Sequence, residues 1–365
     1  MRTEIHIPLS RVYIDESIKR KVSQILESGH YILNKECSLF EEEFAKFIGT
    51  KYAVSVSTGT AAIWLSLISL RVKPNDEIIV PSLTAFPTVE PILYLKAKPV
   101  FVDIDQTYTI NPLAIEQKIT KKTVGIIPVH LYGHPANMRQ ILDLAHKYKL
   151  FVLEDCCQAH GARFQNKPVG SIGDAGCFSF YPSKNLTVCG DGGMIATNSK
   201  SINKMVRVLR DHGRSSKYIH NVIGYNMRFN EIQAAIGRIE LAKLNKFNKR
   251  RRKIANIYFK MLNGLPIIFP QEEEWGYHVY HMFVIRIKGR NAFKKSLFKR
   301  GIGTGIHYPI PCHLQPPILK TWGRMKLPVT EKYCKEILSL PMFPMLKDSQ
   351  VSYISRVIRE ELNKT

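Results

Sequence analysis

The sequence lacks any apolar run that approaches the roughly 20 residues needed to cross a membrane. Its first six residues also lack the apolar core of a secretory signal peptide. Cysteine is sparse and odd in number, with seven residues and no C-x-x-C spacing of the kind that binds zinc. We therefore expect free thiols in a reducing cytoplasm and no membrane partner.

Acidic residues are scarce relative to basic ones. The chain has 30 Asp and Glu against 53 Lys and Arg, which gives a formal net charge of +23. Such a field could attract nucleic acid, an acidic membrane or an anionic small molecule, so the charge discriminates poorly among functions. Because no helix-turn-helix, RNP or zinc signature accompanies it, we expect no specific nucleic acid partner. The densest basic run, residues 249–253, is expected to be a solvated helix face.

The 365 residues suffice for one large domain and a smaller one. Short apolar runs that are typical of buried strands alternate with helical patterns such as residues 85–94 and 231–262, which predicts a mostly parallel α/β sheet. The expected strands are residues 52–56, 78–81, 99–102, 124–129, 150–153 and 176–181. A polar connection after the long helix predicts a large domain at residues 1–245, with an N-terminal arm at residues 5–9, and a small α+β domain at residues 246–365.

Two ionisable residues follow strand-like runs in the middle of the chain. Asp155 comes after residues 150–153, and Lys184 comes after residues 176–181. An open α/β sheet binds its ligands at the C-terminal ends of such strands. Pyridoxal phosphate (PLP) chemistry needs this pair, because the lysine holds the cofactor covalently and the carboxylate keeps the pyridine nitrogen protonated. Taken alone, however, an Asp here is more often a helix N-cap, and a Lys in a Gly-rich loop is usually solvated.

Eight segments carry a resemblance that covers nearly the whole chain. They are residues 57–62, 76–82, 128–133, 154–161, 178–185, 190–193, 224–228 and 307–313. In content and order they resemble the nucleotide-sugar aminotransferases of the DegT/DnrJ type, which are aspartate-aminotransferase-like PLP enzymes. The resemblance implies the type I fold of PLP-dependent transferases. This fold has a mostly parallel sheet in the large domain, one antiparallel strand (expected around residues 194–197) and a smaller C-terminal domain.

The resemblance also implies the cofactor contacts. Lys184 and Asp155 become the catalytic residues, and Gln158 lies near the ring hydroxyl of PLP. The implied phosphate contacts are Thr60, Ala61 and Ser179. A strand, a small-residue turn and a helix start at residues 52–70 form a ready anion site on physical grounds as well, because free N–H groups point outward there.

One further implied cofactor contact involves a second subunit, and another differs from the usual pattern of the family. Asn226 is implied to reach the phosphate bound by the other subunit, which would make the protein a homodimer with shared sites. The aromatic residue that usually stacks on the pyridine ring is replaced here by Ala85. Either Phe86 takes over the stacking, or something smaller covers the ring.

The substrate contacts implied by the resemblance are Tyr181, Arg228, His307, Tyr308 and His313. We expect His160 to be a core or supporting histidine rather than a ligand. Four C-terminal histidines might suggest a metal, but no carboxylate or cysteine completes a ligand set at the usual spacing, so we expect no metal site.

The reaction that the resemblance implies is transfer of an amino group, by family habit from L-glutamate, to a keto sugar carried by a nucleoside diphosphate. The product would serve amino-sugar or polysaccharide biosynthesis. Residues 307–316 resemble the version found in enzymes that aminate the sugar's C3 position, and Lys184 excludes the branch of the family that uses histidine for deoxygenation. A PLP-binding regulator or an idle homologue is the alternative. The complete set of cofactor residues argues against it, since mere binding would not need the lysine and the acid together.

Overall fold

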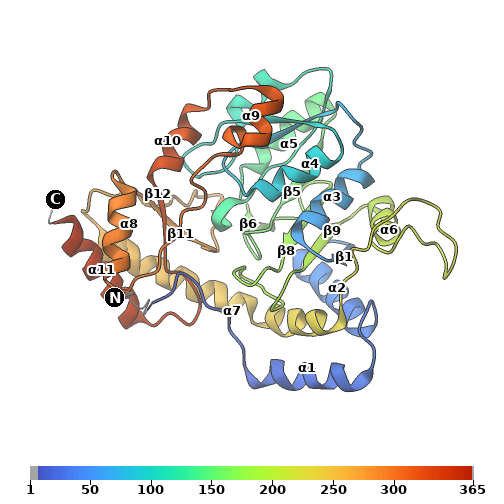
Figure 1. The fold of residues 1–365 in the computed structure, drawn as a ribbon, viewed down its shortest axis with the longest axis horizontal. Coiled ribbons are helices and arrows are strands. Elements are labelled where there is room, and N and C mark those ends of the chain that lie inside the picture. Colours follow the sequence, from blue (N-terminus) through green and yellow to red (C-terminus); the bar gives the residue numbers. More distant parts are fainter. Residues whose placement is uncertain (1–6, 364–365) are drawn as a thin grey trace.

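A seven-stranded sheet forms the centre of the computed structural model, which describes residues 7–363 (Figure 1). The strands lie in the order β1-β9-β8-β5-β4-β2-β3. Their bounds are β1 Tyr52–Val56, β2 Glu77–Pro81, β3 Lys98–Val102, β4 Thr123–Ile126, β5 Phe151–Asp155, β8 Ala175–Ser179 and β9 Gly193–Thr197. All neighbouring pairs are parallel except those of β9, which runs antiparallel to both β1 and β8. The predicted mostly parallel sheet with one antiparallel strand is confirmed.

Helices cover both faces of this sheet because successive strand residues point to opposite sides. Leu153 packs in a hydrophobic cluster with α3, whereas its neighbour Val152 packs in a cluster with α5. The helices of this part are α1 Glu16–Ser28, α2 Lys35–Ile48, α3 Gly59–Ser69, α4 Glu90–Tyr94, α5 Met138–Tyr148 and α6 Lys200–Leu209. Short 3-10 turns occupy Phe86–Thr88, Pro112–Ala114, Glu116–Lys118, Leu131–Gly133 and Cys312–Leu314.

The helix predicted over residues 85–94 is broken in two. Residues Phe86–Thr88 form a 3-10 turn and only Glu90–Tyr94 is α-helical. The reason is local: Pro87 and Pro91 lack the N–H that an uninterrupted helix requires, and each is tolerated only in a first turn. The result is an irregular segment in front of α4, where the sequence pattern predicted a regular one.

The long helix α7, Glu231–Leu262, links the sheet to the C-terminal part (Figure 1). The remaining elements are the hairpin-like β6 Arg163–Phe164 and β7 Lys167–Pro168 with β10 Gly276–Tyr277, then β11 Phe283–Arg286, α8 Arg290–Lys299, α9 Pro316–Trp322, α10 Pro328–Glu336, β12 Ile337–Leu340 and α11 Asp348–Leu362. Along α7, Leu244 still packs with α2, whereas Ile254 and Tyr258 pack with β11, β12 and α11. A domain boundary at 245/246, inside α7, remains a prediction.

The N-terminal arm predicted at residues 5–9 falls partly outside the described residues, which begin at Ile7. Ile7 forms a parallel bridge to Ile302, so this end of the chain lies against the C-terminal part.

The basic run at residues 249–253 is not the solvated face that its composition suggested. Arg250 pairs with Asp348, and Arg252 pairs with Glu272. Arg251 is buried, 3% exposed, and donates to the backbone oxygens of Tyr280, His281 and Met342. Most of this charge therefore ties α7 to the chain that follows it.

Candidate active site

A cavity of about 280 Å³ opens at the C-terminal ends of β5 and β8 and at the start of α3. Its lining residues are Thr58, Gly59, Thr60, Ile63, Thr84, Ala85, Pro87, Thr88, Val129, Asp155, Cys157, Gln158, Ser179, Tyr181, Lys184 and Asp191. Asp155 is the last residue of β5, which pairs with β8, and Lys184 lies five residues beyond the end of β8. The sheet therefore brings together the acid and the amine that the sequence predicts.

One wall of the cavity is a helix start of the kind that binds anions. Thr58 caps α3 by accepting the Ala61 N–H at 2.9 Å, so the amides of the first turn point toward the cavity. Gly59 lies so close to Ser179 that a side-chain Cβ at position 59 would come within 2.7 Å of the Ser179 Cβ. Only glycine permits this approach, which joins the helix start and the serine hydroxyl into one cradle that fits a phosphate.

The acid at the other end of the cavity is well held. Asp155 is 4% exposed, and its two carboxylate oxygens accept hydrogen bonds from Thr88 Oγ1 at 2.8 Å and from the Cys157 N–H at 3.0 Å. These two donors fix the plane of the carboxylate and leave lone pairs on both oxygens that can face a cation. A protonated pyridine nitrogen is such a cation.

The amine of Lys184 is in an environment that favours its neutral form. Burial lowers the pKa of Lys184, while Cys157 and Asp155 act in the opposite direction. Among residues 7–363 no hydrogen bond or ion pair to Lys184 Nζ is present. A lysine amine without a partner, whose pKa is lowered, can act as a nucleophile and a base in such a cavity.

Gln158 connects the cavity to the C-terminal part of the chain. Its side-chain oxygen accepts the Tyr132 N–H at 2.9 Å, and its amide nitrogen donates to the Tyr308 hydroxyl at 3.2 Å. Tyr308 thereby lies next to the residues of the cavity, and its role toward a substrate stays a prediction. Tyr181 lines the cavity and is 53% exposed.

Other predicted residues lie elsewhere. Phe86 does not line the cavity; it packs against the hydrophobic cluster of α3 while Ala85 and Pro87 line the wall, because the 3-10 turn directs its ring inward. Ala61 likewise is buried behind the helix cap, and only its N–H is engaged, by Thr58. Phe86 therefore does not place its aromatic ring in the wall of the cavity.

The two predicted histidines behave differently from each other. His307 borders a small neighbouring cavity of about 60 Å³ together with Ser183, and its Nδ1 lies 2.9 Å from Ser339 Oγ. His313 is fully buried and lies between Ser82 Oγ at 2.5 Å and Glu331 at 3.3 Å. It fastens the C-terminal segment to the end of β2 and does not reach the cavity lining.

Asn226 and Arg228 do not line the cavity of their own chain. Asn226 is exposed and forms a bridge with Asp211, and Arg228 pairs with Asp211 at 3.3 Å. Their placement is compatible with contacts outside a single chain.

A cluster of His130, Glu154 and Cys156 has the residue types of a metal site. Its hydrogen bonds indicate a structural role instead. His130 Nδ1 accepts the Ala136 N–H, so Nε2 carries the proton that it donates to Glu154 at 3.0 Å. Glu154 also accepts three backbone N–H groups, those of Gly170, Ile172 and Gly173. With its nitrogens already engaged, His130 has no free lone pair for an ion.

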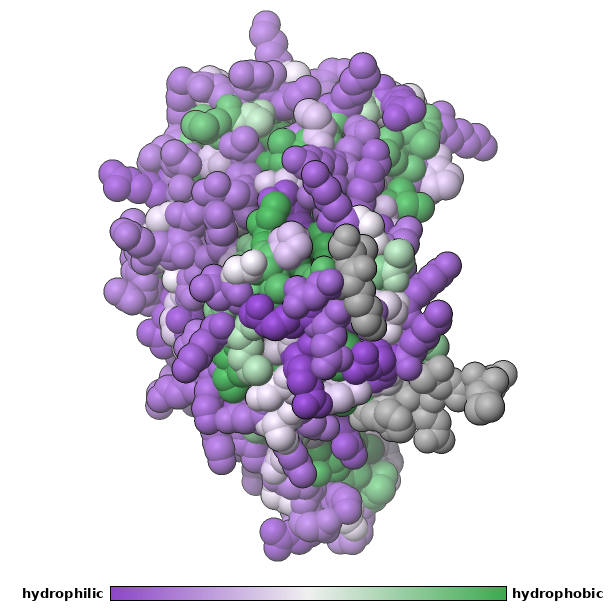
Figure 2. Space-filling model, turned by 90° about the vertical axis from the view of Figure 1, so that its left-hand side faces the viewer, coloured by the Kyte–Doolittle hydropathy of each residue, from purple (hydrophilic) through white to green (hydrophobic). Residues whose placement is uncertain are grey.

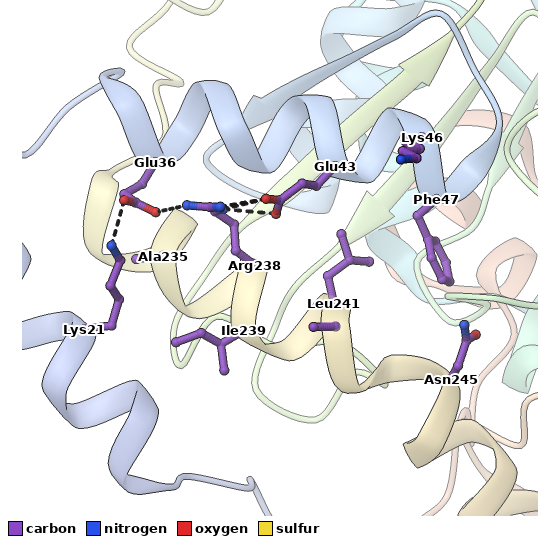
Figure 3. Close-up of a pocket in the computed structure, with 11 residues that line it drawn as sticks. Lys21, Glu36, Glu43, Lys46, Phe47, Ala235, Arg238, Ile239, Leu241 and Asn245 are labelled. Carbon is purple, nitrogen blue, oxygen red and sulfur yellow. Dashed lines mark hydrogen bonds and ion pairs between the residues drawn. The ribbon is translucent and has the colours of Figure 1, made fainter.

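A second, larger hollow of about 770 Å³ lies between α1, α2 and α7 (Figure 3). Most of its charged groups pair with one another: Arg238 pairs with Glu36 and Glu43, and Lys21 pairs with Glu36, whereas Lys46 is exposed. The smaller cavity combines Lys184, Asp155 and the cradle for phosphate, so the catalytic chemistry belongs there.

The mostly parallel sheet, the lysine and carboxylate at its C-terminal edge and the phosphate cradle at a helix start define a PLP-dependent transferase of fold type I. Comparison with known proteins identifies the group within this class. The model of the DegT/DnrJ/EryC1/StrS aminotransferase family matches residues 12–359. The chain belongs to this family.

Individual relatives agree along nearly their whole length. A protein of Acidithiobacillus ferrooxidans named UDP-N-acetyl-3-dehydro-alpha-D-glucosamine 3-aminotransferase is 42% identical over 349 residues, covering 95% of this chain and 94% of the relative. A pleiotropic regulatory protein of Geobacillus stearothermophilus is 40% identical over 361 residues, covering 97% of both. The crystal structure of S. venezuelae DesV in complex with a ketimine intermediate has a TM-score of 0.96 at 37% identity, covering 98% of this chain and 99% of that one.

Within residues 7–363, no helix combines the length and the apolar character needed to span a membrane.

Proposed function

We propose that the protein is a PLP-dependent aminotransferase that converts a keto sugar of a nucleoside-diphosphate sugar into an amino sugar. The observation that carries the proposal is the cavity in which a lysine amine without a partner, a hydrogen-bonded carboxylate and a helix-start cradle converge. The named activity of the Acidithiobacillus relative supports the same substrate class. The chemistry supplied by bound PLP is an electron sink for the carbon that loses its proton.

Each protein group has a distinct task in this reaction. The first turn of α3, Thr60 and Ser179 bind the phosphate of the cofactor, and Asp155 holds the proton on its ring nitrogen. Lys184 Nζ would hold the cofactor covalently at rest. When released, the same amine would take the proton from the donor's α-carbon, a role that requires its neutral form. Burial favours that form because it lowers the pKa of Lys184.

The substrate would enter past Tyr181, His307 and Tyr308. Tyr181 is exposed at the cavity, and Tyr308 is held beside it by Gln158. We propose L-glutamate as the amino donor and C3 as the aminated position; the relative from Acidithiobacillus is named for amination at C3. Relatives with regulatory or sensory names exist, but nothing in the comparisons favours the regulator alternative, and the intact lysine and carboxylate favour catalysis.

We further propose a cytoplasmic homodimer with shared active sites. The loop at residues 212–224 exposes four apolar side chains, namely Tyr218, Ile219, Val222 and Ile223, the last of them 92% exposed. Asn226 lies two residues after this loop and does not line the cavity of its own chain. By contrast, the face that carries α8 and α11 is largely hydrophilic, with apolar residues in small separate groups (Figure 2). An apolar loop of this kind is typical of a subunit contact.

The function is tested by the absorbance of the PLP-loaded protein before and after L-glutamate. The band of lysine-linked PLP should give way to that of the aminated cofactor, and a nucleotide keto sugar should restore it. Lys184→Ala should lack the first band, whereas Lys167→Ala, which alters an exposed lysine, should keep it. A protein without the band, even after incubation with PLP, contradicts the proposal.

The shared site is tested by mixing subunits. Lys184→Ala and Asn226→Ala should each be nearly inactive alone. Hybrid dimers restore one intact site, so a re-equilibrated equal mixture should regain about one quarter of the wild-type activity. A mixture that stays inactive while forming hybrid dimers would contradict shared sites.

A further inference from the structure

Beyond the predicted catalytic residues, one side chain touches the Asp155 carboxylate directly. Thr88 Oγ1 lies 2.8 Å from Asp155 Oδ2, and both residues are almost completely buried. The other oxygen, Oδ1, accepts the Cys157 N–H at 3.0 Å. One donor on each oxygen fixes the plane of the carboxylate and leaves lone pairs on both oxygens for a further donor.

Thr88 is itself fixed by a second hydroxyl. Thr84 Oγ1 lies 2.8 Å from Thr88 Oγ1, and Thr84 is 2% exposed. The direction of the hydrogens follows from chemistry, because an ionised carboxylate only accepts and a threonine has a single hydroxyl hydrogen. Thr88 must give its hydrogen to Asp155, so Thr84 gives its hydrogen to Thr88. The two threonines form a one-way chain that ends on the carboxylate.

The backbone around these threonines is anchored from the far end of the sequence. The Cys312 N–H donates to the Ser82 oxygen at 2.9 Å, and Cys312 Sγ donates to the Thr84 oxygen at 3.4 Å. Thr84 lies two residues before the 3-10 turn and Thr88 is its last residue, and both line the cavity. A buried hydroxyl is costly unless it is bonded, so two of them beside one carboxylate indicate a defined task for them.

We propose that Thr88, oriented by Thr84, is a positioning residue that holds the Asp155 carboxylate toward the ring nitrogen of PLP. The inference rests on the proposed function, since it assigns Thr88 a part in the same site. Thr88 acts only through Asp155 and makes no contact of its own with the reacting atoms.

The test compares Thr88→Val with Thr88→Ser. Valine keeps the shape of threonine and loses the hydroxyl, whereas serine keeps the hydroxyl. A hydrogen bond to a charged group is strong, so Thr88→Val should lower kcat by roughly 10- to 100-fold and raise the dissociation constant of PLP about tenfold. Thr88→Ser should stay within about threefold of the wild type in both quantities.

The chain offers a matched control in Thr107. Its hydroxyl donates to Asp105 at 2.5 Å and lies 2.9 Å from Thr109 Oγ1, which repeats the Thr–Thr–Asp arrangement outside the cavity lining. Thr107→Val should therefore lower the melting temperature of the apoprotein, as Thr88→Val does, but leave the PLP dissociation constant unchanged. Because Thr88 acts through Asp155, Thr88→Val should have no further effect on PLP affinity in an Asp155→Asn background.

Three results would overturn the inference: equal PLP affinities for Thr88→Val and Thr107→Val, a serine variant as impaired as the valine variant, or full additivity with Asp155→Asn. The wild type separates this failure from that of the proposed function. A wild type that binds PLP and responds to L-glutamate, with Thr88→Val unaffected, rejects only the role of Thr88. A wild type that binds no PLP rejects both.

Discussion

The two carboxylates at the end of β5 are neighbours in sequence, yet they lie in opposite environments. Glu154 is completely buried on one side of the strand and accepts four hydrogen bonds, one from His130 Nε2 and three from backbone amides. Asp155 lies on the cavity side and accepts two, from Thr88 and Cys157. On one face the strand thus carries Glu154, whose accepting sites are all used, and on the other Asp155, which can accept further hydrogen bonds.

The difference separates a structural acid from a functional one. Four donors exhaust the usual accepting sites of a carboxylate, so Glu154 can only hold the segment at residues 170–173 in place. Asp155 keeps lone pairs free beside the cavity, and Lys184 there has an amine without a partner. Spare hydrogen-bonding capacity in a buried place costs stability, and it persists where a ligand uses it.

Asp155→Asn should produce the largest change in activity. The amide has the same shape but lacks the negative charge that keeps the ring nitrogen protonated, so we expect kcat to fall by roughly 10²- to 10³-fold. The melting temperature of the apoprotein should fall slightly, as for Thr88→Val, and less than for Glu154→Gln, because two hydrogen bonds are altered rather than four. Steady-state kinetics beside thermal denaturation measures both. Near-normal turnover would remove Asp155 from its proposed role.

Glu154→Gln should have the opposite profile. Whichever oxygen becomes an amide then faces two donors instead of accepting from them, so we expect the free energy of unfolding to fall by about 2–4 kcal/mol. Activity per folded molecule should remain. Denaturant unfolding and active-site titration with PLP distinguish the two effects. If this variant loses activity without losing stability, the contrast between the two faces of β5 is wrong.

The local sequence was sufficient for much of the fold. The apolar runs of β1, β2 and β5 and the helical pattern of α7 lie within a few residues of their predicted bounds, because burial and periodicity are properties of the segment itself. The pattern failed at residues 85–94, where two prolines interrupt a helical period. It also misjudged Arg251, whose backbone partners lie 29 to 91 residues away in the chain.

Site residues could be predicted from the sequence only where they belong to a recognisable motif. Lys184 and Asp155 stood out because two strand ends place them at one sheet edge. Thr88 carried no signal, since its bond to Asp155 spans 67 residues and a buried threonine resembles any other core residue. His313 resembled a substrate ligand in its motif, yet its partner Ser82 lies 231 residues away and holds it in the interior.

Lys184→Met tests whether the polar groups of the cavity cost stability, in contrast to Glu154, and its expected effect is the smallest. If the polar groups that line the cavity are present to bind a ligand, removal of the Lys184 amine should stabilise the apoprotein. Removal of the Glu154 carboxylate should destabilise it. Burial lowers the pKa of Lys184 in the folded state, so the unfolded chain binds more protons at pH values between the folded pKa and the ordinary value of about 10.4. The stability of the wild-type apoprotein therefore rises with pH through that interval.

Methionine fills a similar volume without an amine. The variant should melt higher than the wild type near neutral pH, by about 2–4 °C for each kcal/mol of relieved burial, and the difference should shrink as the pH approaches 10.4. Melting curves of the two apoproteins from pH 7 to pH 10 measure this, with Lys167→Met as the control for an exposed lysine. A lower melting temperature for Lys184→Met at every pH would mean that the cavity face is built for stability as much as the buried face is.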